Sequence, residues 1–450
     1  MQEKRFQNRI KIFTYALTIL VIWVHSVNLT PEILSAAGIA AAGAADAVDI
    51  TNTAGTGDIA SAALYRFACA LETFFTDTLG QTAVPGFFMV SAFLFFRKLP
   101  ERTEKANRTR QTERLEKANR TDRAEGIKPT GGKKTACLSP TWVLQKWKRR
   151  FFSLFLPFVI WNLLYYLLHL LAGSAEALLG MPQTERVPFD LSAVLSAALL
   201  YTYNPVFWYL YQLILLTLLA PALFYLMRGK KSGAVFLVLS FFAAVFWERL
   251  PFHPVNEDAL FYYLLGIYGA LHGKDLIETG RHAVQAMSVI IGLLILWCMI
   301  FQTGMLPEAI RQTAAFAIAR SVSFRAAVPL LLYFLLTVLM LRGEERLRCG
   351  EQMACREQTE QLIEKLPGFM EISFFIYATH YLVIKTVHAL LFSVLAELSS
   401  GTVILTNSGI LLLLAVYFLL PLICTAAAYL GSRAMKQFMP EMWKLLSGGR

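Results

Sequence analysis

The sequence has few charged residues and few cysteines. Only 16% of its 450 residues are charged and 56% are hydrophobic, whereas a soluble domain carries about a quarter charged residues. This balance excludes an ordinary soluble globular protein and favours a membrane protein. The six cysteines form no CxxC pair and have no histidine at metal-ligand spacing. We therefore interpret all six as structurally neutral and expect no metal site.

Common catalytic motifs are also missing. The sequence contains no GxSxG, no HExxH and no phosphate-binding glycine loop, which argues against the enzyme classes that depend on them. The segment from His253 to Asp258 matches the HxxxxD pattern of glycerolipid acyltransferases. It follows Pro251 in a short predicted outer loop, remote from cytosolic coenzyme A, so we interpret the match as coincidence.

Long apolar runs dominate the chain. Many approach the roughly 20 residues that a helix needs to span a bilayer, and they predict an all-α bundle of about ten transmembrane helices. We expect residues 1–450 to form a single membrane domain. The predicted spans are 12–28, 79–96, 151–172, 206–227, 232–247, 259–272, 285–304, 326–341, 371–393 and 405–430.

Loops rich in basic residues alternate along the chain with loops that have few. Of the 42 Lys and Arg residues, 35 fall in loops on one side and 6 on the other, and Lys385 lies within a span. Because Lys and Arg are retained on the cytoplasmic side, both termini are expected in the cytoplasm.

The predicted loop at residues 97–150 carries 17 basic and 6 acidic residues, and its sequence Glu104–Thr109 recurs at Glu116–Thr121. Such a polar insert between spans 2 and 3 is expected to be disordered or weakly helical. It is either a patch for anionic lipid headgroups or a local duplication that reinforces orientation. No aromatic platform accompanies the repeats, so we expect no nucleic-acid partner. The Ala-rich segment 30–60 is predicted to be an outer loop.

Histidines are the conspicuous ionisable residues of the predicted spans, which contain no Asp. An ionisable group inside a membrane is costly and is a functional candidate by default. At 3.6 residues per turn, Thr14 and Thr18 share a helix face with His25, and Tyr377 shares one with His380. Two polar stripes on helices from opposite ends of the chain predict a shared cavity. Each histidine is alternatively a structural hydrogen-bonding residue between helices. The other conspicuous ionisable residues in the spans are His169, His388 and Lys385, and Glu371 sits at a margin.

A cavity with histidines suits acyl transfer from a thioester to a hydroxyl. Imidazole has a pKa near 6.5, so it can take a proton from the hydroxyl at neutral pH. Coenzyme A also requires cations for its phosphates, preferably guanidinium groups. Arg149 and Arg150 stand at the entrance of the third span beside Lys148. The alternative interpretation is an ordinary positive-inside anchor.

Six segments, in order along nearly the whole chain, resemble the membrane acyltransferase-3 family of bacterial surface-polysaccharide O-acyltransferases. They are Ile19–Ser26, Ala83–Leu94, Lys148–Trp161, Phe207–Pro221, Phe261–Gly266 and Ser373–His380. The second segment has Ala92 where the family usually has Gly. Where many members have Arg, eleven residues before His25, this chain has Thr14, and Lys11 one turn below is the expected replacement. If no cation replaces that Arg, either the donor is held differently or activity is lost.

The resemblance implies a bacterial cell-membrane enzyme with a ten-span bundle. It implies an acyl-CoA donor, such as acetyl-CoA, that enters from the cytoplasm without being a bound cofactor, and a surface or lipid-linked carbohydrate acceptor. It marks His25 as the catalytic base and Arg150 as a donor-site cation. It also marks four residues as lining the cavity: Ser91, Trp208, Tyr377 and His380.

Two other functions remain open from the sequence. A polysaccharide-precursor transporter or flippase would usually show intramembrane carboxylates or matched helix breaks, and neither is clear here. A non-catalytic membrane scaffold would use the basic loop as its working part.

Overall fold

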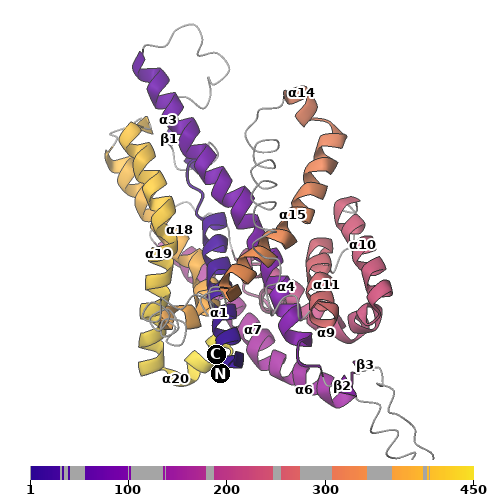
Figure 1. Ribbon diagram of the computed structural model, residues 1–450. Coiled ribbons are helices and arrows are strands. Elements are labelled where there is room, and N and C mark those ends of the chain that lie inside the picture. The colour runs from indigo at the N-terminus through magenta and orange to yellow at the C-terminus, as the bar shows by residue number, and fades with distance from the viewer. Residues whose placement is uncertain are drawn as a thin grey trace, which may run out of the picture.

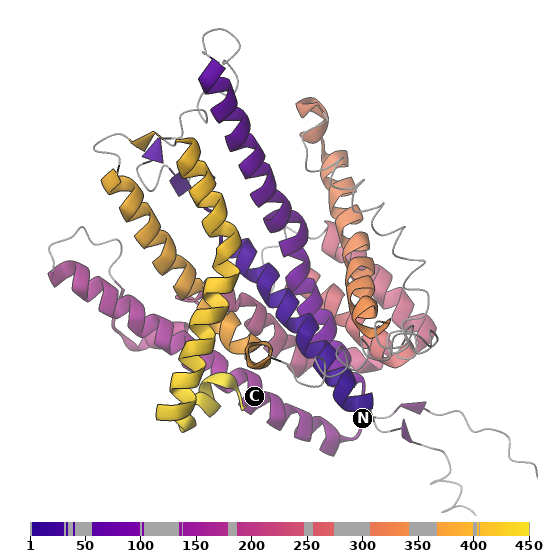
Figure 2. The ribbon, with the colours of Figure 1, turned by 60° about the vertical axis from the view of Figure 1, so that its left-hand side comes forward.

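The fold is described from a computed structural model (Figures 1 and 2). The structure describes residues 2–30, 33–34, 39–40, 56–99, 101–102, 135–136, 138–178, 187–246, 255–273, 307–341, 367–398, 403–404 and 406–449. Within these ranges the chain is helical apart from short connections and two pairs of two-residue strands, which confirms the all-α class. Strand β1 pairs in parallel with β4, and β2 pairs with β3 in the antiparallel direction.

The elements of the first half begin near the N-terminus and end at the α9 helix. They are α1 Gln2–His25, β1 Ile39–Ala40, α3 Thr56–Thr73, η1 Phe74–Leu79, η2 Gly80–Thr82, α4 Ala83–Phe96, β2 Glu101–Arg102, β3 Thr135–Ala136, α6 Pro140–Arg150, η3 Phe151–Phe155, α7 Leu156–Leu178, α8 Leu191–Leu199, η4 Pro205–Phe207 and α9 Trp208–Met227.

The elements of the second half complete the bundle. They are α10 Lys230–Phe246, α11 Glu257–His272, α14 Glu308–Arg311, α15 Ala314–Leu341, α17 Gly368–Glu371, α18 Ser373–Leu398, β4 Val403–Ile404, α19 Asn407–Phe438 and α20 Pro440–Ser447. Several helices start at a residue whose side chain accepts a backbone N–H, as short polar side chains at helix N-termini usually do. The capping residues are Ser139, Asp190, Asn256 and Thr406.

Two long helical segments contain a wide turn. The π-helical turn η1 joins α3 to η2 and α4, and the π-helical turn η3 joins α6 to α7. In the second segment, Pro157 lacks the N–H that would otherwise bond one turn back, which favours an irregular turn just before it. Such turns are frequent at functional sites. Here η3 directly follows Arg150.

Helix α1 lies at the centre of the bundle and packs against α4, α15, α18 and α19 (Figure 1). Its Leu17 and Ile22 are completely buried, while many large apolar side chains of α10 and α19 are exposed. Exposed apolar side chains at this density meet lipid rather than water. The bundle thus surrounds α1 with helices whose outer faces suit a bilayer.

Six described helical segments have the length and hydropathy of membrane spans. They are Ala62–Phe96, Pro140–Ser174, Pro205–Met227, Ala314–Tyr333, Ser373–Leu395 and Asn407–Phe438. Each overlaps one of the predicted spans. The predicted spans 12–28, 232–247 and 259–272 fall on α1, α10 and α11. The predicted span 285–304 lies outside the described residues.

Several predicted boundaries were wrong. Helix α3 begins at Thr56, inside the predicted outer loop 30–60, and continues through η1 and η2 into the span predicted to start at residue 79. Helix α15 begins at Ala314 rather than at residue 326. In both cases charged residues lower the local hydropathy, although the helix continues through them. The predicted loop 97–150 also ends early, because its last eleven residues form α6. Residues 103–134 lie outside the described residues.

Helices α4 and α11 pack with their backbones in close contact. A Cβ atom built on Gly266 would lie 2.3 Å from the Met89 carbonyl oxygen and 2.8 Å from the Ala92 Cβ. Small residues at such a crossing allow helices in a membrane to approach closely. The contact between α4 and α11 therefore depends on the absence of a side chain at Gly266.

We expect Gly266→Ala to lower the free energy of unfolding by about 1–3 kcal/mol, since the helices must separate to admit the methyl group. Thermal unfolding of the purified protein in detergent measures the change. Gly173→Ala is the matched control, because no heavy atom lies within 4 Å of a Cβ atom there. Equal unfolding midpoints for the two variants would contradict the close packing.

Candidate functional site

A cavity of about 280 Å³ lies between α1, α4, η3, α9 and α18. Apolar side chains form much of its wall, and a set of polar side chains from distant parts of the sequence forms the rest. The polar lining residues are Thr14, Thr18, Ser91, Arg150, Ser153, Tyr209, Ser373 and Tyr377. Polar groups gathered in a mostly apolar cavity are typical of a small-molecule site.

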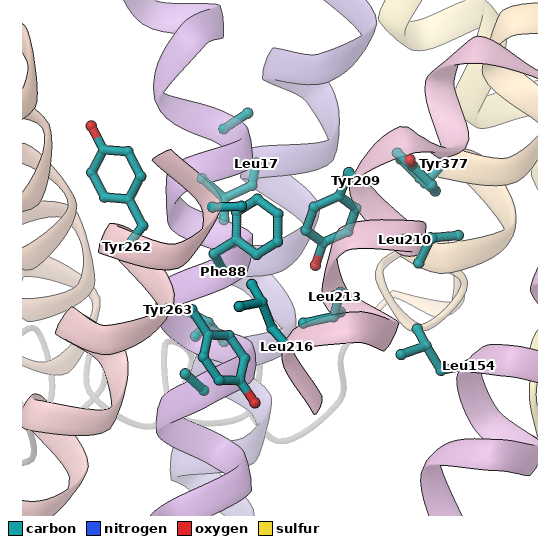
Figure 3. Packing of buried hydrophobic residues seen from close by; sticks show 14 of the residues in the cluster. Leu17, Phe88, Leu154, Tyr209, Leu210, Leu213, Leu216, Tyr262, Tyr263 and Tyr377 are labelled. Atoms are coloured by element: carbon teal, nitrogen blue, oxygen red, sulfur yellow. The ribbon is translucent and has the colours of Figure 1, made fainter. Parts of the chain in front are cut away.

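Aromatic packing shapes the α9 side of the cavity. Tyr209 lies between Phe88 and Tyr377 (Figure 3), with ring centres 4.8 Å from Phe88 and 6.0 Å from Tyr377. The Tyr209 hydroxyl is 3.5 Å from Ser91 Oγ. The Tyr377 hydroxyl donates a hydrogen bond to the Val206 carbonyl. The two tyrosines are therefore held in place by packing and by hydrogen bonds.

Arg150 is the charged side chain among the described lining residues. It ends α6, where Lys148 and Arg149 precede it, and it is half-buried while both neighbours are exposed. A guanidinium group binds phosphate or carboxylate through paired hydrogen bonds. Arg150 therefore gives the cavity an anion-binding group. Arg149, although it is adjacent in the sequence, is not among the described residues that line the cavity.

His25 and His380 form a pair next to this cavity. Their ring centres are 5.4 Å apart, and the His380 ring is 5.7 Å from that of Tyr377, which lines the cavity. His25 is half-buried at the C-terminal end of α1, and His380 is completely buried. Neither histidine is among the described residues that line the cavity. Tyr377 is the link between the cavity and the histidine pair.

The Tyr377 carbonyl determines the tautomer of His380. Its oxygen is 2.5 Å from His380 Nδ1. Because a carbonyl oxygen can only accept, Nδ1 must carry the hydrogen, and in the neutral imidazole this leaves Nε2 with a free lone pair. Nε2 is buried and has no hydrogen-bond partner within the described part of the chain. One imidazole of the pair is thus preset as a proton acceptor.

The N-terminal half of α1 presents hydroxyl groups to the cavity. Thr14 Oγ1 lies 2.9 Å from the Ile10 carbonyl, and Thr18 Oγ1 donates to the Thr14 carbonyl at 2.9 Å. Lys11, the expected replacement for a cation at position 14, forms an ion pair with Glu371 at 2.9 Å. The Glu371 carboxylate balances the charge of this ammonium, and Lys11 is not among the described residues that line the cavity, so Arg150 is the cation in the described cavity wall.

The structure brings some predicted residues together and leaves others apart. Five predicted residues line one cavity: Thr14, Thr18, Ser91, Arg150 and Tyr377. Trp208 is half-buried against the core, and its neighbour Tyr209 takes the position at the cavity wall. The sequence offered no signal for this choice, because both residues belong to the same motif.

The other ionisable residues predicted in the spans lie apart from the cavity. His169 is exposed on α7, and Lys385 is exposed on α18 with its ammonium 5.4 Å from the centre of the Tyr381 ring. Asp258, from the HxxxxD match, pairs with Arg325 through two contacts of 2.6 and 2.9 Å. Its carboxylate is therefore occupied by a structural ion pair. His253 lies outside the described residues.

Glu72 is a buried carboxylate that no sequence pattern indicated, because it lies ahead of the predicted start of the second span. It is 3% exposed, and its Oε2 accepts the backbone N–H of Leu29 at 3.2 Å. Asn28 Nδ2 donates to the Leu413 carbonyl at 3.0 Å. These bonds hold the segment that directly follows His25. The apolar residues from Ala62 onward were the sequence signal that could have revealed a longer helix.

We expect Glu72→Ala to lower the free energy of unfolding by about 1–3 kcal/mol, because the buried Leu29 N–H loses its acceptor. Glu72→Gln keeps an acceptor oxygen of the same reach and should retain most of the stability. Thermal unfolding of both variants gives the comparison. Equal losses for Ala and Gln would show that the bond to Leu29 does not hold this segment.

The sequence model of a family described as an acyltransferase domain matches residues 16–430. Comparison with curated proteins gives no match, and comparison with solved structures gives none either. The matched range contains both histidines of the pair, Arg150 and Tyr377, so the family match and the cavity concern the same part of the molecule. The chain belongs to the acyltransferase-3 family of membrane acyltransferases.

Proposed function

We propose that the protein transfers a short acyl group, acetyl in the simplest case, from acyl-CoA to a hydroxyl group of a cell-surface or lipid-linked carbohydrate. One observation carries the proposal: a single cavity has the guanidinium of Arg150 in one wall and Tyr377 in another, with the histidine pair directly behind Tyr377. A cation for the donor and a proton acceptor for the hydroxyl are the two groups that this reaction requires.

His25 is proposed as the base. Its imidazole takes the proton of the acceptor hydroxyl while the hydroxyl oxygen attacks the thioester carbonyl carbon. The C–O bond forms, the C–S bond breaks, and the proton passes to the sulfur of the leaving coenzyme A. His380, with its Nδ1–H held by the Tyr377 carbonyl, supports the pair as a second proton acceptor. The cavity volume of about 280 Å³ favours a short acyl group.

Topology supports a donor that arrives from the cytoplasm of a bacterial cell. The two termini lie next to each other at one end of the bundle, and α6 with Arg150 lies at that same end (Figure 1). Loops assigned to this side hold 35 of the 42 Lys and Arg residues. By the positive-inside rule this end faces the cytoplasm, where acyl-CoA is found. The complete bundle is proposed to have about ten spans.

A transporter for a polysaccharide precursor is the second candidate, and buried Glu72 favours it. Intramembrane carboxylates often couple transport to ions. Glu72, however, accepts the Leu29 N–H and serves the bundle as a structural group. If a deletion strain fails to export the glycan but still acylates it, the transporter would be favoured.

We expect His25→Ala to reduce acyl transfer by about 10²- to 10⁴-fold, since general base catalysis contributes on this order. The assay follows label from acetyl-CoA into glycan, using membranes that contain the protein and glycan extracted from cells that lack the gene. His169→Ala is the matched control, because His169 is exposed on α7 away from the cavity. Transfer at the wild-type rate by the His25 variant would reject His25 as the base.

We expect Arg150→Ala to raise the KM for acetyl-CoA by about 10- to 100-fold, the equivalent of one or two charge-assisted hydrogen bonds. Arg149→Ala removes the same charge from the adjacent exposed position and should change this KM much less. Steady-state kinetics at saturating acceptor separates the two. Equal increases in the KM for acetyl-CoA would show that Arg150 acts only through its positive charge, as Arg149 does, and not as a specific binding group.

A further inference from the structure

Two asparagines are buried with unpaired amides. Asn162 on α7 is 1% exposed, and Asn204, directly before η4, is 0% exposed. Within the described residues, neither the Nδ2 nor the Oδ1 atom of either amide has a hydrogen-bond partner, so the amides are not bonded to each other. Buried polar groups in proteins are normally hydrogen-bonded, because an unpaired one is costly. Four unpaired amide atoms therefore point to a ligand that pairs with them.

Asn162 lies on the face of α7 that meets Phe207 and α18. Phe158, one turn earlier, stacks on Phe207 with ring centres 6.0 Å apart. Tyr165, nearly one turn later, donates its hydroxyl to the Ala378 carbonyl at 3.0 Å. Residues at these spacings share one helix face. Asn162 thus lies at the junction of α7, η4 and α18.

Asn204 reaches the same junction from a strained connection. Tyr201 has a φ of 34°, a conformation that is rare for a residue with a side chain, and its carbonyl accepts the Asn204 N–H at 3.0 Å. Two residues after Asn204, the Val206 carbonyl accepts the Tyr377 hydroxyl. Phe207 stacks on Tyr377 with ring centres 5.7 Å apart. Tyr377 therefore joins the asparagine junction to the cavity.

The chemistry of this junction differs from that of the Arg150 wall. An amide offers donors and an acceptor without charge, and Nε2 of His380, which adjoins Tyr377, adds one more acceptor. A hydroxyl group both donates and accepts, so neutral hydroxyls match the asparagines. A phosphate or carboxylate would find no cation among Asn162, Asn204 and His380, and it belongs at Arg150.

We propose that Asn162 and Asn204 bind the hydroxyl groups of the acceptor, and that this acceptor is a neutral, hydroxyl-rich sugar ring. The inference rests on the proposed acyl transfer and names the acceptor class and its binding residues. It assigns the two substrates to different groups of residues, with the anionic donor at Arg150 and the neutral acceptor at the asparagines, which are not among the described residues that line the cavity. Tyr377 contacts both regions, because it lines the cavity and packs against Phe207 and His380.

The test uses the full-length protein in lipid nanodiscs, with glycan extracted from cells that lack the gene as the probe. Calorimetry gives its Kd, and transfer of label gives the KM of glycan and of acetyl-CoA. Asn162→Leu and Asn204→Leu should each raise the Kd and the KM for glycan about tenfold, the loss expected for one hydrogen bond. The KM for acetyl-CoA should stay unchanged. The Tm should not fall, because the replaced amides have no protein bonds to lose.

Asn256→Leu is the matched control, with the same substitution at an asparagine that does have partners. Its side chain accepts the Ala259 N–H at 3.0 Å as the cap of α11, so this variant should lower the Tm and leave the KM for glycan unchanged. Lower Tm values for the Asn162 and Asn204 variants, with an unchanged Kd for glycan, would overturn the inference. Tight glycan binding by the wild-type protein without transfer would reject the proposed function and keep the hydroxyl site. A wild-type protein that does not bind the glycan would overturn both.

Discussion

A polar side chain inside an apolar bilayer requires a partner, and this constraint organises the bundle around α1. Helix α1 carries two hydroxyls that line the cavity and, at its C-terminal end, one histidine of the pair. The helices around it supply the complementary groups, including the imidazole of His380 and the carboxylate of Glu72. Glu72 binds the segment just after α1, so the position of His25 depends on α3 as well as on α18.

Irregular backbone occurs where the polar groups are concentrated. The π-helical turn η3 follows Arg150 and contributes Ser153 and Leu154 to the cavity, while η1 follows the helix that carries Glu72. A wide turn rotates the side chains after it relative to those before it. In the α6–η3–α7 segment, this rotation allows one continuous helical run to present Arg150 to the cavity and Asn162 to the junction with α18.

The proposed reaction assigns the two substrates to chemically different groups of residues. A guanidinium attracts the phosphates of the donor, whereas unpaired amides favour neutral hydroxyls. Tyr377 lines the cavity and packs against Phe207 and His380, so it links both groups to the histidines proposed to take the hydroxyl proton as the new ester bond forms. The asparagine junction offers no cation among Asn162, Asn204 and His380, so the anionic donor is disfavoured in the acceptor position.

The amino-acid sequence alone determined membrane residence, helical class and family, because hydropathy and motif order are local properties of the chain. Helical periodicity and resemblance singled out Thr14, Thr18, Ser91, Arg150 and Tyr377, and the structure places these five around one cavity.

Only the tertiary structure decided which side chains face the cavity and which charged groups pair, because both depend on how each helix is rotated and which helices it contacts. It put Tyr209 rather than Trp208 at the cavity wall, and it paired Lys11 with Glu371. It also extended two helices through charged residues, because Glu72 and Arg325 find partners in other segments of the chain. Hydropathy counts such residues as breaks, since a partner 43 or 67 residues away in the sequence lies outside the local window that is averaged.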